Sequence, residues 1–199
     1  MNIFTRIKNK LGLLPAKKEE GPSYEFKRGE INRLRLQYGT NILVETGTFF
    51  GDTVDYFKSF FNKVYSIELS PDLAAKAKRR FESEKNIQII EGDSGKILTT
   101  LVKEIDEPAL FWLDGHYSSE FFVGEEFIKT GRGEKDTPVL EELGVILSCM
   151  INHIVLIDDA RLFTGANDYP TIDQIRQLVQ KLKSGHSVKV ENDIIYIFY

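Results

Sequence analysis

The sequence predicts an α/β protein with a doubly wound, mostly parallel sheet of seven strands that ends in an antiparallel hairpin. Short apolar runs alternate with helical segments, a pattern typical of a parallel sheet flanked by helices. The last two apolar runs are separated by Asn192-Asp193, a turn sequence typical of a hairpin. With 199 residues, 42% of them hydrophobic, the chain suits one globular domain.

Residues 1–22 are expected to form a basic N-terminal arm, and residues 23–199 to form the folded domain. The arm carries several lysines and arginines before its first acidic residue. This pattern would suit weak contact with an anionic membrane surface, and a frayed, solvated terminus is the alternative. The first helix of the domain is expected to place Ile31 and Leu34 on one face and to end at Gly39.

Each strand of the predicted sheet is a short apolar run. The runs expected to form parallel strands are residues 42–45, 63–69, 87–90, 109–113 and 154–157. The runs expected to form the hairpin are residues 187–190 and 194–198. Because parallel strands need long crossover connections, the segments between the first five runs are expected to be helical.

Several helices have recognisable ends in the sequence. Ser70 and Thr137 each precede a proline, and a hydroxyl cap followed by proline is typical of the first turn of a helix. Thr171 and Gln174 have the spacing of a capping box, and Gly185 is expected to end the same helix.

The composition disfavours several classes of function. The formal net charge is −4, with acidic and basic residues interspersed, so no nucleic-acid partner is expected. The single cysteine, Cys149, lies in an apolar run and indicates a structural thiol instead of a disulfide framework. No apolar stretch is long enough to span a bilayer or to resemble a signal peptide, which predicts a cytoplasmic protein.

A glycine-containing turn follows the first predicted strand. Glu45 ends this strand, and Gly47 and Gly51 stand four residues apart before the next helix. Such glycines let the backbone approach a ligand beside free helix N-terminal amides. The spacing differs from the dinucleotide fingerprint, and the Glu45 carboxylate suits a cationic amine better than a pyrophosphate.

Acidic residues also end the second and third predicted strands. Glu68 can accept hydrogen bonds from both hydroxyls of a ribose. Asp93 can accept from the exocyclic amine of an adenine, with Ser94 at the ring edge. Each of these residues alone could equally be a solvated strand end or a helix cap. Together with Glu45 they follow three successive strands, at the edge of the sheet where ligands bind.

These residues resemble motifs I, II and III of class I S-adenosylmethionine (SAM)-dependent methyltransferases, which have a Rossmann-like sheet. Motif I corresponds to residues 45–51, motif II to Glu68 and motif III to Gly92-Asp93. The resemblance covers the chain from about Tyr24 to its C-terminus. It implies SAM as cofactor, bound by Glu45, Thr46, Gly47, Thr48, Gly51, Thr53, Glu68, Asp93, Ser94 and Asp114.

Three aspartates are expected to converge beyond the fourth and fifth strands. Asp114 follows one strand, and Asp158 and Asp159 follow its predicted neighbour. Three converging carboxylates would repel one another unless one were protonated or a cation lay between them, and oxygen ligands favour magnesium. The arrangement resembles bacterial metal-dependent O-methyltransferases acting on sugars, which implies Asp114, Asp158 and Asp159 as metal ligands. The alternative is that Asp158 and Asp159 only cap the next turn.

His116 and Asp114 are the predicted catalytic residues. A histidine has an ordinary pKa near neutral pH and suits a general base, although His116 could instead be a hydrogen-bonding neighbour of the metal ligands. Residues 117–136 are expected to form a lid or substrate-binding insertion. Its aromatic residues could stack on a sugar or pack the loop onto the domain.

The sequence therefore predicts a SAM-dependent O-methyltransferase, assisted by a divalent cation, that acts on a hydroxyl of a small sugar-like or glycan-related acceptor. A non-catalytic SAM-binding subunit and a hydroxylase-like enzyme on the same scaffold are the alternatives. A homo-oligomer is compatible with the sequence.

Overall fold

The computed structural model describes residues 21–115, 120–123, 126–129, 131 and 137–199. Their centre is a seven-stranded sheet in the order β3-β2-β1-β4-β7-β9-β8. The strands are β1 Ile42–Thr46, β2 Lys63–Glu68, β3 Ile87–Glu91, β4 Ala109–Leu113, β7 Ile154–Ile157, β8 Ser187–Glu191 and β9 Ile194–Phe198. The pairs from β3 across to β7 are parallel, and β9 is antiparallel to both of its neighbours. The structure therefore confirms the predicted sheet and its hairpin.

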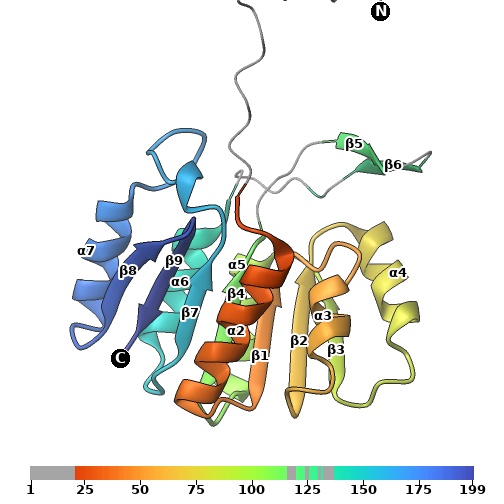
Figure 1. The fold of residues 1–199 in the computed structure, drawn as a ribbon, viewed down its shortest axis with the longest axis horizontal. Helices are drawn as coiled ribbons and strands as arrows, with labels where there is room; N and C mark the ends of the chain where they lie inside the picture. Colours follow the sequence, from red (N-terminus) through yellow and green to blue (C-terminus); the bar gives the residue numbers. More distant parts are fainter. Residues whose placement is uncertain (1–20, 116–119, 124–125, 130, 132–136) are drawn as a thin grey trace, which may run out of the picture.

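Helices cover both faces of this sheet (Figure 1). One face carries α2 (Tyr24–Tyr38) and α3 (Asp52–Phe57). The other face carries α5 (Ser94–Glu104), α6 (Val139–Ser148) and α7 (Ile172–Leu182), and α4 (Pro71–Arg80) packs against β2 and β3. A separate apolar core lies on each side of the sheet.

Burial falls from the centre of the sheet to its edges. Every residue of β1, β4 and β7 is buried, whereas the edge strands β3 and β8 keep exposed positions. Central strands lose water on both faces because helices pack on each, so their sequences are continuous apolar runs instead of alternating ones. This difference made the central strands easy to recognise in the sequence.

The element ends agree with the sequence at most positions. Gly39 caps α2 in the left-handed conformation, and the Thr171 capping box is present. Two predicted ends were wrong by a short distance. The helix after Thr137 begins at Val139, whose N–H donates to the Thr137 hydroxyl at 3.3 Å. The last helix ends at Leu182 with a Lys183 cap instead of continuing to Gly185.

The carboxyl ends of the parallel strands meet at one edge of the sheet, which is at the top of Figure 1. The chain order reverses there, because β2 and β3 lie on one side of β1 whereas β4 and β7 lie on the other. Ligands of doubly wound sheets bind at such a switch point. The hairpin of β5 (Glu120–Val123) and β6 (Glu126–Lys129) lies beyond the same edge.

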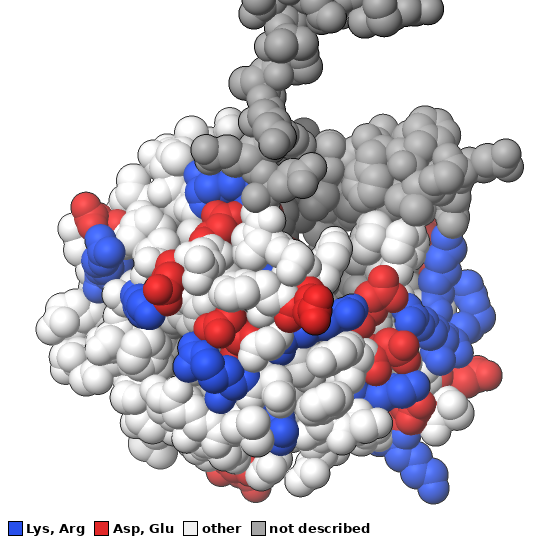
Figure 2. All heavy atoms as spheres, viewed as in Figure 1, with Lys and Arg blue, Asp and Glu red and all other residues white. Residues whose placement is uncertain are grey.

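Acidic and basic side chains are interspersed on the face shown in Figure 2. This distribution agrees with the charge pattern of the sequence. Within the described part of the chain, no helix is both long and apolar enough to cross a membrane.

Candidate active site

Glu45 is a buried carboxylate at the end of β1, with 2% of its surface exposed. Its Oε2 accepts a hydrogen bond from Ser66 Oγ of β2 at 2.5 Å, and the Thr53 side chain also bonds to it. Burial raises the pKa of Glu45 to about 8, and the groups with the largest effects on that pKa include no cation. A buried carboxylate whose partners are neutral is chemically matched to a positively charged ligand.

Two threonines of the predicted cofactor site lie beside Glu45. Thr48 Oγ1 is 2.7 Å from Ser66 Oγ. When Glu45 is ionised, the single Ser66 proton goes to its carboxylate, and Thr48 is then the donor in this pair. The neighbouring Thr46 is fully buried, and its side chain hydrogen-bonds to Glu142 of α6. The edge of β1 therefore holds buried hydroxyls that contact two buried acidic side chains.

Contacts within the protein require both glycines of the turn. Gly47 has φ 86°, and a Cβ there would lie 2.5 Å from the backbone oxygen of Asp114. Gly51 has φ 82°, and a Cβ there would lie 2.7 Å from the Phe81 ring. From the sequence alone, the two glycines were predicted to let a ligand approach the backbone. The structure adds that the turn is packed against β4 on one side and against Phe81 on the other.

Glu68 links the end of β2 to the same turn. Its Oε2 accepts the Phe49 N–H and its Oε1 accepts the Ser70 N–H, both at 2.8 Å. Burial raises the pKa of Glu68, and these backbone hydrogen bonds oppose the rise. The Leu69 and Thr48 N–H groups also stabilise the ionised form of Glu68, so a ribose hydroxyl would have to share the carboxylate oxygens with the turn.

The third predicted acidic residue, Asp93, is the N-cap of α5 and accepts the Gly95 N–H at 3.0 Å. The adjacent Ser94 is buried and hydrogen-bonds to Glu142 of α6, a residue that the sequence did not single out. Burial raises the pKa of Glu142 to about 7. The Thr46 side chain also hydrogen-bonds to Glu142. Glu142 therefore links the end of β1 to the start of α5.

Lys27 lies among the aspartates that the sequence predicted as metal ligands. Its Nζ is 2.5 Å from Asp158 Oδ2 and 4.0 Å from Asp159 Oδ1. Burial lowers the pKa of Lys27, but the hydrogen bond and charge of Asp158 outweigh it, so the pKa is raised overall. The Asp114 carboxylate contributes to this rise. The charges of all three predicted metal ligands therefore affect the pKa of Lys27.

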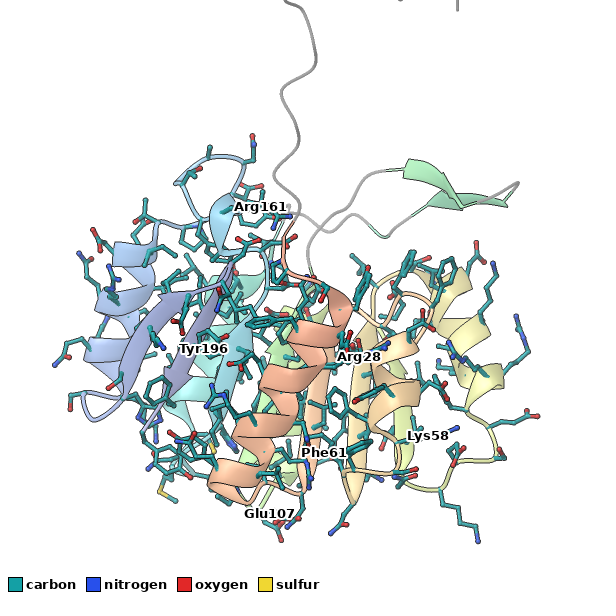
Figure 3. All side chains as sticks on the ribbon, in the orientation of Figure 1. Arg28, Lys58, Phe61, Glu107, Arg161 and Tyr196 are labelled. Carbon is teal, nitrogen blue, oxygen red and sulfur yellow. The ribbon has the colours of Figure 1, made fainter. Side chains whose placement is uncertain are left out.

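Arg161 supplies a second cation to the same edge. Its guanidinium is 3.0 Å from Asp159 Oδ1 and forms an ion pair with Asp193 of the hairpin turn. Figure 3 shows Arg161 at the upper edge of the sheet, far from Lys58 and Glu107 at the other end. Asp159 has φ 56°, which turns the chain into the short helix Ala160–Leu162. The two carboxylates after β7 are thus each paired with a cation of the chain.

Asp114 follows β4 directly, and its N–H donates to the Thr46 carbonyl at 3.1 Å. Burial and the nearby Asp158 carboxylate raise the pKa of Asp114 well above its usual range. The expected convergence of the three aspartates is therefore present. In the described part of the chain, however, no group of three acidic, histidine or cysteine side chains has the arrangement of a metal site. His116, the predicted base, lies outside the described residues.

Comparisons with solved structures give the same fold. No protein-family model and no curated protein sequence matches the chain. A methyltransferase from Podospora anserina, PaMTH1, solved with S-adenosylhomocysteine (SAH), has TM-score 0.57 and 16% identity, over 100% of this chain and 88% of that one. An O-methyltransferase from Bacillus cereus in complex with SAH has TM-score 0.55 and 12% identity, over 98% and 88% of the two chains.

A third solved structure, the O-methyltransferase TomG from Streptomyces achromogenes in complex with SAM, has TM-score 0.53 and 13% identity. That likeness covers 100% of this chain and 99% of the other. At these identities the comparisons establish the fold, which is the class I methyltransferase fold. The activity has to be inferred from the site itself.

Proposed function

We propose that this chain is a SAM-dependent O-methyltransferase that acts on a hydroxyl of a small, sugar-like or glycan-related acceptor. The observation that carries the proposal is Glu45, a buried carboxylate with neutral partners beside a glycine turn at the switch point of the sheet. The three solved neighbours, which contain SAM or SAH, support the choice of cofactor.

The residues of the chain fit SAM at both of its ends. Glu45 would face the α-ammonium group of the methionine part, which would favour the ionised form of this carboxylate. Glu68 would accept the ribose hydroxyls, and Asp93 with Ser94 would lie at the adenine. The buried hydroxyls of Ser66 and Thr46 and the buried Glu142 carboxyl make the surroundings of this site polar.

The reaction is a displacement at carbon. The acceptor oxygen forms a bond to the methyl carbon, the carbon–sulfur bond breaks with its electron pair on sulfur, and the hydroxyl proton passes to a base. His116 is the proposed base. The chain would contribute mainly by positioning the acceptor and excluding water. We assign residues 117–136 to acceptor binding, because β5 and β6 of this insertion lie at the catalytic edge.

Divalent-metal assistance, which the resemblance implied, is not part of this proposal. Asp158 and Asp159 are already paired with Lys27 and Arg161, and these pairs use the oxygens that a magnesium ion would need. A metal ion would have to displace an ammonium group from Asp158 before binding there.

An activity screen tests the proposal. Purified protein is incubated with SAM and with hydroxylated sugars, nucleotide sugars or catechols, and SAH release is measured with and without magnesium. We expect SAH release that depends on the acceptor, at equal rates in both conditions. Binding of SAH without turnover of any acceptor would instead identify a non-catalytic subunit. An oxidised product without SAH would identify a hydroxylase-like enzyme.

A further inference from the structure

We infer that Lys27 provides the positive charge at the acceptor end of the site, in the position expected for a divalent cation, and that methyl transfer by this protein needs no metal ion. The inference rests on the proposed function. It assigns to Lys27 the binding of the acceptor oxygen, a role that the sequence had given to a metal held by three aspartates.

The ammonium group lies beside two of these carboxylates. Lys27 Nζ is 2.5 Å from Asp158 Oδ2 and 4.0 Å from Asp159 Oδ1, and the Lys27 side chain is only 15% exposed. The other oxygen of Asp158 accepts the Asp159 N–H at 2.8 Å. Both oxygens of Asp158 are therefore engaged by groups of this chain, and no further cation is needed to neutralise it.

The fold holds Lys27 in this position. Lys27 lies near the start of α2, and Ile31 and Leu34, one and two turns further along the helix, are 1% and 3% exposed in the core. The Lys27 N–H donates to the Ser23 carbonyl at 3.0 Å. An anchored backbone lowers the entropy lost when the long side chain is ordered at the site.

The cations already present also oppose a metal ion at this edge. Lys27 pairs with Asp158, and Arg161 pairs with both Asp159 and Asp193. A divalent ion between the carboxylates would lie within a few ångströms of the ammonium group and would be repelled by it.

An ammonium group can replace a metal ion in binding the oxygen of a hydroxyl acceptor and in stabilising negative charge on it. Lys27 has three N–H donors, of which Asp158 receives one. A second donor can bind the acceptor oxygen and stabilise the negative charge that remains on it as its proton leaves. Unlike a metal ion, the ammonium group accepts no lone pair, so the base at this edge has to remove the proton.

The test compares the parent with Lys27→Met, which keeps the length of the side chain and removes its charge, and with Lys27→Arg. Lys103→Met is the matched control, because Lys103 is an exposed lysine in the last turn of α5. Three quantities are measured for each protein: Mn²⁺ binding by electron paramagnetic resonance, SAH binding by calorimetry, and turnover with and without a chelator.

The parent is expected to show no Mn²⁺ site and to keep full turnover in the chelator. Lys27→Met is expected to gain Mn²⁺ binding, because its carboxylates lose their cation, and to lose about 100-fold in kcat with little change in SAH affinity. Lys27→Arg should keep more activity than Lys27→Met, and Lys103→Met should match the parent. The double variant Lys27→Met/Asp158→Asn removes both charges together, so it provides a test even if Lys27→Met folds poorly. Its turnover should fall as much as that of Lys27→Met.

Two results would overturn the inference: a Mn²⁺ site in the parent that is lost together with turnover in the chelator, or unchanged kcat in Lys27→Met. If no acceptor is turned over, the proposed function fails, and the Mn²⁺ measurement alone decides which cation belongs at this edge.

Discussion

Neutral donors hold the carboxylates of Glu45 and Glu68 at the ends of β1 and β2, whereas cations hold Asp158 and Asp159 at the end of β7. All four follow or end buried parallel strands, so their local sequence surroundings are similar. The difference lies in the partners that the fold brings to them. The first pair keeps its capacity to meet a positive ligand, while the second pair is already neutralised within the chain.

Under the proposed function, this contrast divides the site into two ends. The end at β1 and β2 would bind the cationic, hydroxyl-bearing cofactor, and the end at β4 and β7 would bind the acceptor without a metal. Four substitutions test this division, and their expected effects decrease in the order Gly47→Val, Glu45→Gln, Glu68→Gln and Arg161→Met.

Gly47→Val should have the largest effect. The new Cβ would lie 2.5 Å from the Asp114 backbone oxygen, at φ 86°. We expect the turn to be displaced, SAH binding to disappear, and the free energy of unfolding to fall by roughly 2 to 4 kcal/mol. Calorimetry and heat melting measure both. Gly144→Ala is the matched control, because a Cβ at this helical position meets nothing within 4 Å; it should bind SAH as the parent does.

Glu45→Gln should change stability and binding in opposite directions. The folded-state pKa of Glu45 is raised from 4.5 to about 8, so its contribution to stability is present below the unfolded pKa and is lost as the pH rises through 8. The variant should therefore be more stable than the parent by on the order of 3 kcal/mol near pH 9, and similar near pH 5.

The same variant should bind SAH about tenfold or more weakly than the parent, because the ligand ammonium loses its carboxylate partner. Melting curves at the two pH values and calorimetry near neutral pH measure these effects. A variant that melts like the parent at high pH would show that Glu45 is not a buried, uncompensated acid.

Glu68→Gln should have a smaller effect on binding. The amide oxygen can still accept one of the two backbone N–H groups, but a charged acceptor for the ribose is lost. We expect SAH affinity to fall by about 1 kcal/mol, roughly fivefold, while the variant remains folded. Equal affinity in parent and variant would remove Glu68 from the proposed cofactor site.

Arg161→Met should have the smallest effect of the four. The Arg161 side chain is 37% exposed, and exposed ion pairs contribute about 1 kcal/mol or less. We expect a small loss of thermal stability and unchanged SAH affinity, because Arg161 lies at the acceptor end. A large loss of SAH binding would contradict the division of the site into two ends.

The sequence predicted the parts of this molecule that depend on neighbouring residues. The apolar runs of the central strands, the Gly39 cap and the Thr171 capping box were all recognisable, because periodicity and capping act over a few residues. The convergence of the aspartates after β4 and β7 also followed from the order of the strands.

Long-range partners could not be predicted in this way. Lys27 meets Asp158 across 131 positions of the chain, and the only local sign was its place near the start of a helix. Glu142 hydrogen-bonds to Ser94 from a helix whose sequence has an ordinary amphipathic pattern. The contact of Gly51 with Phe81 depends on how α4 packs. Such pairings are set by tertiary packing, which no local pattern encodes.

The most direct test of this two-ended site is a calorimetric titration of SAH into the parent protein. The titration is done in the presence of a chelator and in buffers of different ionisation enthalpy. We predict binding without added metal, accompanied by release of a proton near neutral pH, because the ligand ammonium ionises a Glu45 carboxyl whose pKa is raised to about 8. Absence of SAH binding, or binding that appears only when magnesium is added, would contradict this division.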